Sequence, residues 1–186
     1  MDSRILHQGR FLTFRVDTIE HADGTTGTRE IAGHPGAVAI VAIDSEDRVL
    51  LVRQYRLAVG KALLEIPAGT LDRLGGGSVE DPDVAARREL EEETGARAST
   101  WQRLGSFYTA PGFAEELMYL YLATDLRPAD GERLQPDADE HLILERIPWP
   151  EAVAAAETGQ LRDAKTIVGL LLVDRLRAAP AGASGI

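Results

Sequence analysis

Three glutamates near the middle of the chain have the side chains and the spacing that could bind a divalent cation. Glu89, Glu92 and Glu93 are related by i, i+3 and i+4, so a helix would place their carboxylates on one face. Like charges at this spacing repel one another unless a cation neutralises them. Mg²⁺ prefers oxygen ligands and often shares its shell with substrate phosphates, so the cluster indicates a magnesium site that acts on a phosphorylated molecule. A solvated helix face in an acidic protein is the alternative interpretation.

The residues around this cluster supply a more specific interpretation. Residues 88–96 (RELEEETGA) resemble the second half of the Nudix box, R-E-U-x-E-E-x-G-U, in which U is a bulky apolar residue. Seven residues separate Glu80 from Arg88, as the full pattern G-x5-E-x7-R-E-U-x-E-E-x-G-U requires. The chain is therefore similar to the Nudix family of hydrolases, and so many matching positions argue against a merely solvated helix face.

Two positions of the box differ from the family pattern. The box glycine would fall at Leu74, and the nearest counterpart is Gly69, so residues 72–79 are interpreted as carrying an insertion. The last position is Ala96, which is small for a bulky apolar site. Neither difference removes a carboxylate, so the resemblance still implies catalysis.

The flanks of the box resemble the ADP-ribose pyrophosphatase subfamily. Residues 53–56 (RQYR) and 64–69 (LEIPAG) are similar to the stretch that leads into its box. Residues 110–116 (APGFAEE) are similar to its S-P-G-F-x-x-E loop, and Pro111 follows Gly95 by sixteen positions, the spacing associated with ADP-ribose. The resemblance extends from about residue 10 to about residue 175.

This resemblance implies a metal site and its ligands. Glu89 and Glu93 would be the main ligands, with Glu92 as a further ligand and catalytic carboxylate and Ala68 contributing its backbone carbonyl. Two or three Mg²⁺ ions, with Mn²⁺ as an alternative, would neutralise phosphate oxygens and lower the pKa of a bound water. Glu80 would organise the box and not touch the metal.

The resemblance also implies residues that bind the substrate. Arg56 and Arg53 would hold phosphate, because a guanidinium is planar and permanently charged. Glu116 would contact the terminal ribose or its water network. The remaining predicted contacts lie at a strand end, in the loop after the box and in the N-terminal region: Glu65, Gly112, Phe113, Arg29 and Glu30.

The resemblance also implies that the general base lies in an acidic stretch before a late strand, which here is residues 136–142 (PDADEHL). Glu140 is the predicted water-activating base and Asp139 is the second candidate. Ala138 stands where relatives often have another acid, which leaves the choice between neighbouring residues open. His141 is interpreted as an exposed loop residue.

The elements that must position these residues follow from hydrophobic patterning and turn residues. A helix is expected from Asp81-Pro82 to about Thr94, ended by Gly95, with Val84, Ala85 and Leu90 forming its buried stripe. Two β-branched runs, 37–43 and 48–54, predict a hairpin of strands covered on both faces. The other expected strands are 10–17, 28–34, 104–108, 117–123 and 142–147, and the other helices are 149–157 and 163–178.

This order of elements predicts an α+β fold, a Nudix-type α/β/α sandwich with a mixed central sheet and a small N-terminal β region. Residues 1–35 are predicted to form that β region, residues 36–178 the hydrolase domain, and residues 179–186 a flexible tail. The resemblance implies a homodimer in which the N-terminal strands exchange between subunits. Arg29 and Glu30 would then reach across to the partner's substrate.

The composition of the chain excludes several other classes of protein. The 186 residues, 44% hydrophobic and 27% charged, suit one soluble domain. Cysteine is absent, which excludes disulfides, cysteine nucleophiles and thiolate zinc sites. The net charge of −10 argues against binding to nucleic acid or an anionic membrane. No apolar stretch reaches about 18 residues and no signal core is visible, so a cytoplasmic location is expected.

The expected reaction is cleavage of ADP-ribose to AMP and ribose 5-phosphate by metal-activated water. One alternative is a pyrophosphatase for another nucleoside diphosphate sugar, such as GDP-mannose or UDP-glucose. Another is a Nudix domain that senses a nucleotide sugar without cleaving it, which the intact Glu89, Glu92 and Glu93 argue against. A generic acidic scaffold protein is a distant third.

Overall fold

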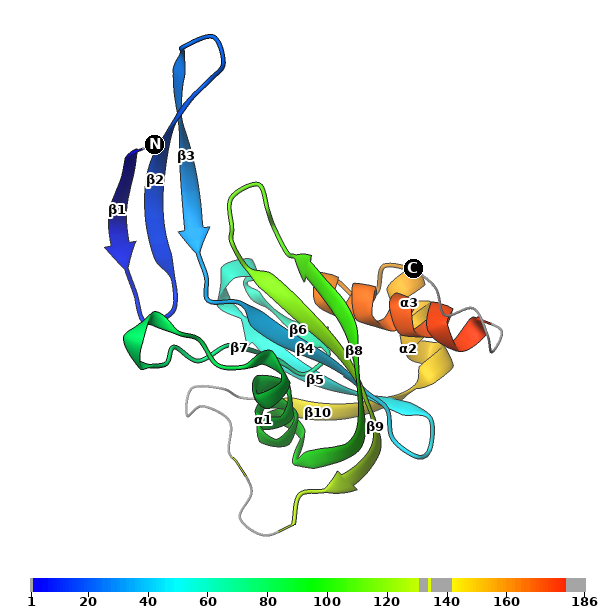
Figure 1. Ribbon diagram of the computed structural model, residues 1–186. Helices are drawn as coiled ribbons and strands as arrows, with labels where there is room; N and C mark the ends of the chain where they lie inside the picture. The colour runs from blue at the N-terminus through cyan, green and yellow to red at the C-terminus, as the bar shows by residue number, and fades with distance from the viewer. Residues whose placement is uncertain (1, 131–133, 135–141, 180–186) are drawn as a thin grey trace.

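The computed structural model describes residues 2–130, 134 and 142–179 of the chain. Its elements are arranged as a body of two sheets and three helices, from which a third, N-terminal sheet projects (Figure 1). The strands are β1 (Asp2–Gln8), β2 (Thr13–Glu20), β3 (Thr26–Gly33), β4 (Ala37–Ala42), β5 (Arg48–Arg56), β6 (Lys61–Glu65), β7 (Ala68–Thr70), β8 (Ala96–Tyr108), β9 (Leu117–Pro128) and β10 (Ile143–Pro148). The helices are α1 (Pro82–Thr94), α2 (Trp149–Glu157) and α3 (Ala164–Ala178), with short 3₁₀ turns η1 (Leu57–Val59) and η2 (Gly75–Gly77).

The sheet that carries the site is mixed. Its order is β7-β4-β9-β8, with β4 parallel to β9 and antiparallel to β7. A second sheet, β10-β5-β6, is antiparallel throughout. Parallel strands need a long connection, and here the chain supplies it through β5 to β8. The prediction of an α+β fold with a mixed sheet is confirmed.

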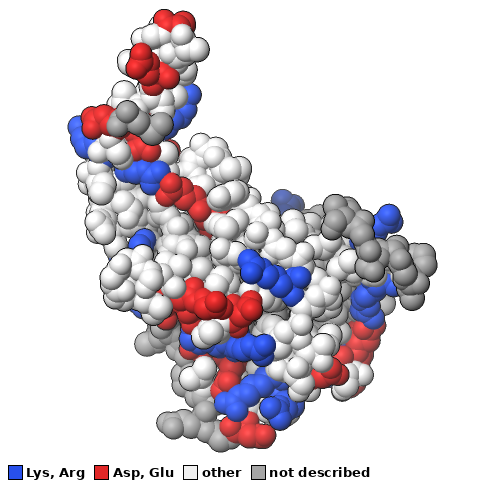
Figure 2. All heavy atoms as spheres, in the orientation of Figure 1, with Lys and Arg blue, Asp and Glu red and all other residues white. Residues whose placement is uncertain are grey.

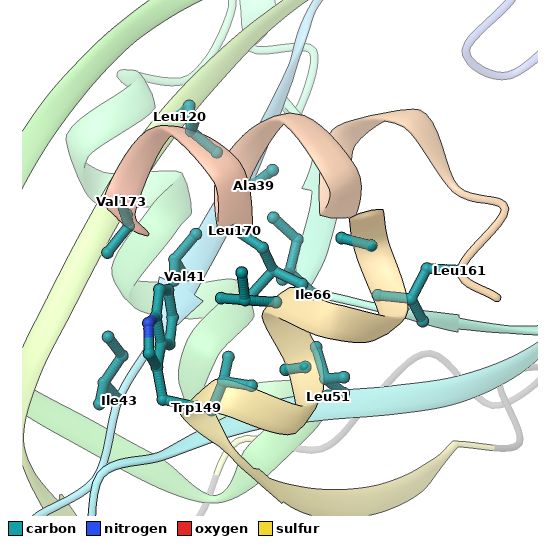
Figure 3. Packing of buried hydrophobic residues seen from close by; sticks show 14 of the residues in the cluster. Ala39, Val41, Ile43, Leu51, Ile66, Leu120, Trp149, Leu161, Leu170 and Val173 are labelled. Atoms are coloured by element: carbon teal, nitrogen blue, oxygen red, sulfur yellow. The ribbon is translucent and has the colours of Figure 1, made fainter. Parts of the chain in front are cut away.

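Helices cover the mixed sheet on both faces. On one face, Ala85, Ala86 and Leu90 of α1 pack against β4 and β9. On the other, α2 and α3 bury Trp149, Leu170 and their neighbours against the opposite side of β4 (Figure 3). Every residue of β4 is buried, as its unbroken apolar run predicts. The three layers form the expected α/β/α sandwich.

The predicted hairpin between the β4 and β5 runs was wrong. A tight turn does form at Asp44, whose side chain accepts bonds from the Glu46 and Arg48 amides at 3.0 Å. The two strands nevertheless share only one bridge, Ile43 to Val49, and then separate into different sheets. A strand has two edges, and β7 and β9 already occupy both edges of β4.

Helix α1 begins and ends where the sequence predicted. The Asp81 side chain accepts a bond from the Asp83 amide at 2.8 Å, and Gly95 adopts the left-handed conformation that ends the helix. One detail was wrong: Val84 is 57% exposed, and Ala86 takes its place in the buried stripe. Ala85 and Leu90 are buried as predicted.

The N-terminal sheet β1-β2-β3 stands away from the body (Figure 1). Strand β1 was not predicted because all of its residues are exposed and their pattern carries no buried face. Strands β6 and β7 were also not predicted, and β7 has only three residues, too few for a hydrophobic pattern. The boundary expected at residue 35 falls between β3 and β4. Of the expected flexible tail, residues 180–186 lie outside the described part of the chain.

Membrane insertion through a helix is not supported: among the described residues, no helix is long and apolar enough to cross a bilayer.

Candidate active site

The acidic face of α1 is organised by one arginine. Arg88 donates through Nε and Nη2 to Glu80, at 3.1 and 2.7 Å, and through Nη1 to Glu89 at 2.7 Å and Glu92 at 2.9 Å. The hydrogen bond from Arg88 is the main reason why the pKa of Glu80 is lowered. A guanidinium thus offsets much of the like-charge repulsion expected along this helix. Figure 2 shows the same pattern on the visible face, where acidic and basic side chains lie next to one another in small groups.

The backbone of β7 lies directly against these carboxylates. The Ala68 amide donates to Glu93 at 3.1 Å. A Cβ added to Gly69 would lie 1.9 Å from the Glu89 carboxyl group, so a larger residue at this position would displace that carboxylate. Antiparallel pairing of β7 with β4 fixes this segment in place. Strand β7 and α1 therefore form one unit, in which backbone and carboxylates meet at close range.

The donor chemistry of this unit fits a hard divalent cation. Glu89 and Glu93 are 8% and 5% exposed, and with Glu92 and the Ala68 carbonyl they offer oxygen ligands of the kind that Mg²⁺ prefers. Within the described ranges, however, no three acidic or histidine side chains converge as a ready metal site. Arg88 bonds to two of the carboxylates, so a cation would compete with it for Glu89 and Glu92.

A second charged cluster lies beside this unit. Arg56, at the end of β5, donates to Glu65 through Nε at 2.8 Å and Nη2 at 2.7 Å. Lys165 of α3 donates to the same carboxylate and to Asp163 at 3.0 Å. Glu65 is 1% exposed: burial opposes its ionisation, but Arg56 and Lys165 outweigh burial and lower its pKa. The charge of Glu93 also acts on Arg56, which links the two clusters.

Strand β7 and the second charged cluster border one cavity of about 310 Å³. Its walls come from β4, β5, β7, β9 and the start of α3, and from the loop that precedes β9. The lining residues are Ala37, Arg56, Ala68, Gly69, Thr70, Thr109, Glu116, Met118, Asp163, Ala164 and Lys165. The cavity therefore has cations on one wall and the backbone beside the α1 carboxylates on another.

Glu116 reaches this cavity from the loop after β8. Thr109 donates to one of its oxygens at 2.5 Å, and Nε2 of His34 lies 3.8 Å from the other. The Gly36 amide donates to Nδ1 of His34 at 3.1 Å, and burial lowers the pKa of this histidine. Burial thus disfavours the charged form of His34, which lies beside Glu116.

The loop that carries Gly112 and Phe113 is fastened to the N-terminal sheet. The Ala32 amide donates to the Phe113 carbonyl at 2.8 Å, and Arg15 pairs with Glu115 at 2.5 Å. Gly112 and Phe113 are themselves exposed, and the Phe113 side chain is 62% exposed. In the chain they lie between Thr109 and Glu116, which both line the cavity, but they do not line it themselves.

Three residues predicted to bind substrate lie away from this cavity. Arg53 pairs with Glu145 at 2.6 Å and borders a separate cavity of about 420 Å³ under α2. The reason is strand geometry: residues 53 and 56 are three apart, so their side chains leave β5 on opposite faces. Arg29 and Glu30 are exposed on β3, in the projecting sheet. Glu140 and Asp139, the candidate bases, lie outside the described residues.

Sequence reasoning missed Lys165, Asp163, Thr109 and His34 as neighbours of the site. One signal was available for Lys165, since it is one of only two lysines and follows the Asp163 cap of a predicted helix. The contacts themselves join residues that are far apart in sequence, as between Glu65 and Lys165, and no local pattern indicates them.

Comparison with known proteins shows which family the chain resembles. The model of a family described as the NUDIX domain matches residues 33–168. An ADP-ribose pyrophosphatase of Mycobacterium tuberculosis is 40% identical over 93% of this chain and 81% of its own length. A methanol dehydrogenase activator of Bacillus methanolicus is 39% identical over 89% of this chain and 86% of its own. A solved structure described as an ADP compounds hydrolase has a TM-score of 0.78 and 26% identity, and the match covers 95% of this chain and 91% of that one.

Proposed function

The chain belongs to the Nudix family, and from this membership we propose that it hydrolyses ADP-ribose to AMP and ribose 5-phosphate. The observation that carries the proposal is the single cavity that brings Arg56 and Glu116 together with the backbone beside the α1 carboxylates. A pyrophosphate substrate needs cations for its phosphates and acidic groups for a metal and for its sugar hydroxyls. Arg56, Lys165 and Glu116 line this cavity of about 310 Å³, and its β7 wall lies against the α1 glutamates.

The metal ligands are Glu89, Glu92, Glu93 and the Ala68 carbonyl. Nudix hydrolases generally need a divalent metal, usually Mg²⁺, which when bound neutralises phosphate oxygens and lowers the pKa of water. We propose two or three ions in this site. Arg88 holds Glu89 and Glu92 close together, because its guanidinium bonds to both and offsets their mutual repulsion.

The residues that hold the substrate have different roles. Arg56 binds the pyrophosphate, since its side chain is 40% exposed and borders the cavity. Glu65 acts through Arg56, because both of its oxygens are bonded to cations and it is almost fully buried. Glu116 binds ribose hydroxyls, with Gly112 and Phe113 shaping the approach from their loop. Glu140, or Asp139 beside it, takes the proton from the attacking water.

A substrate panel tests this function. Purified protein with Mg²⁺ is expected to release AMP from ADP-ribose in preference to products from GDP-mannose, UDP-glucose or diadenosine polyphosphates. Glu93→Gln removes a metal ligand while keeping the size of the side chain, so kcat should fall by roughly 10²-fold or more. Glu157→Gln, on the exposed end of α2, serves as a control that should keep full activity.

The outcomes of the panel separate the alternatives. Faster turnover of another nucleoside diphosphate sugar would retain the site and contradict the ADP-ribose assignment. Tight ADP-ribose binding without turnover would favour a sensor. Equal activity in Glu93→Gln would contradict the metal assignment.

A further inference from the structure

Lys165 occupies a position where a positive charge is energetically unfavourable. It lies in the first turn of α3, where the positive end of the helix dipole disfavours a cation, and it is only 9% exposed. Burial of an ammonium group is also unfavourable unless carboxylates compensate it. Two carboxylates do so, Glu65 from β6 and Asp163 from the cap of the same helix. A position with these costs suggests that the charge serves a purpose beyond packing.

The charges around Lys165 balance only when it is present. Glu65 and Asp163 supply two negative charges, and Arg56 and Lys165 supply two positive ones. If Lys165 became neutral, this wall of the cavity would carry a net charge of −1 next to the glutamates of α1. Among the residues that the structure describes, Glu65 would then have Arg56 as its one cationic partner, which would draw the guanidinium away from an incoming phosphate.

The cap of α3 keeps Lys165 in this position. Asp163 accepts from the Thr166 amide at 3.0 Å, and the Thr166 hydroxyl accepts from the Ile66 amide at 2.8 Å. The start of α3 is therefore attached to the segment that joins Glu65 to β7. Lys165 also borders the substrate cavity, together with Arg56.

We propose that Lys165 is a positioning residue for substrate binding: by sharing the Glu65 carboxylate with Arg56, it keeps the Arg56 guanidinium available to the phosphates of the substrate. This inference rests on the proposed function, because it concerns the same cavity. It assigns to α3 a part in substrate affinity, although α3 lies outside the Nudix box.

Kinetics of three variants test the inference. Lys165→Gln keeps hydrogen-bond donors for both carboxylates but removes the charge, so KM for ADP-ribose should rise by roughly five- to fifty-fold with a smaller change in kcat. Lys165→Arg keeps the charge and should restore KM to within about threefold of the wild type. Lys61→Gln, at the exposed start of β6, is the matched control and should leave KM unchanged. An unchanged KM in folded Lys165→Gln would overturn the inference.

A double-mutant cycle separates positioning from a purely structural role. If Lys165 acts through Arg56, the effect of Lys165→Gln on KM should largely vanish in an Arg56→Gln background. Additive effects on KM would overturn the inference, as would a lowered melting temperature with KM unchanged. If Lys165→Gln fails to fold, the more conservative Lys165→Arg decides: wild-type affinity in this variant supports a role for the charge, and a large loss overturns it.

Binding measurements distinguish failure of this inference from failure of the proposed function. Calorimetry with ADP-ribose, in Ca²⁺ to limit turnover, should give a Kd that rises in Lys165→Gln in parallel with KM. If the wild type binds ADP-ribose more tightly than Lys165→Gln does but does not cleave it, the inference stands and the hydrolase function fails. If the wild type cleaves ADP-ribose and Lys165→Gln binds it equally well, the function stands and the inference fails. A wild type that neither binds nor cleaves ADP-ribose would overturn both.

Discussion

At the scale of single residues, the Glu89 carboxylate occupies the space that a side chain at Gly69 would fill. This explains why the glycine nearest to the box matters although it lies five positions earlier than the family spacing requires. The family pattern would place a glycine at position 74, where this chain has Leu74, which is exposed. The close approach to a carboxylate therefore belongs to Gly69.

Gly69→Ala should reduce activity without unfolding the protein. A methyl group at this position would lie 1.9 Å from the Glu89 carboxyl carbon, so the carboxylate must move by about an ångström or more. A misplacement of that size costs roughly 10²-fold in kcat/KM. Steady-state kinetics with ADP-ribose and Mg²⁺ measure the effect.

The matched control is Gly75→Ala, because nothing lies within 4 Å of a Cβ added there. Its kcat/KM should stay within about twofold of the wild type. Wild-type activity in Gly69→Ala would show that Glu89 does not need its present position.

At the scale of elements, the segment before α1 holds the box together. The expected insertion, residues 72–79, forms a small loop closed by the Arg73–Val79 bridge and a Leu74 to Ser78 hydrogen bond. Arg73 donates to the Phe11 carbonyl at 3.1 Å, which ties this loop to the turn between β1 and β2. At its other end, Glu80 leads into the Arg88 network.

The hydrogen bonds between Arg88 and Glu80 should make the free energy of unfolding depend on pH in the acidic range. The Glu80 pKa is lowered from its ordinary value of 4.5, chiefly by the hydrogen bond from Arg88, so the ionised form stabilises the fold. The contribution is fully present above about pH 4.5 and is lost as the pH falls through the lower pKa of the folded state. Urea unfolding of the wild type and of Glu80→Gln between pH 3 and 7 measures it.

We expect the free energy of unfolding to decrease less steeply below pH 4.5 in Glu80→Gln than in the wild type. Glu46→Gln, on an exposed turn, should follow the wild-type curve. Parallel curves for all three proteins would contradict the stabilising role of the Glu80 charge.

At the scale of the whole molecule, the projecting sheet carries a group of exposed apolar side chains. Large apolar side chains that are 39% to 59% exposed lie on β1, on β2 and in the turn between them: Ile5, Leu6, Phe11, Leu12 and Phe14. Strand β1 also has an open edge. We propose that a second copy of the chain covers this surface in a homodimer, with Arg29 and Glu30 reaching the partner's cavity.

Deletion of residues 1–35 should therefore give a monomer with little ADP-ribose hydrolysis, as measured by sedimentation velocity and product analysis. Phe14→Asp is a milder test, because a buried charge in the interface should shift the protein towards monomer. His21→Asp, at the exposed turn between β2 and β3, is the control and should remain dimeric. A truncated monomer with full activity would contradict the proposal.

The amino-acid sequence by itself determined the local features of this protein. The ends of α1 at Asp81 and Gly95, and the shared face of Glu89, Glu92 and Glu93, follow from capping and from a helical period that acts within a few residues. The mixed sheet and its covering helices also agreed with the order of apolar segments, because β4 is apolar on both faces.

Only the tertiary structure decided which distant residues meet. The sharing of Glu65 by Arg56 and Lys165, the separation of Arg53 from Arg56, and the absence of a β4–β5 ladder among the described strands depend on which faces and edges are already occupied. Local sequence carries little information on such choices, since each is settled by the packing of segments up to 100 residues apart. The chemistry of the acidic helix can thus be predicted from the sequence. Arg56 and Lys165, by contrast, come together at the cavity only when the chain folds.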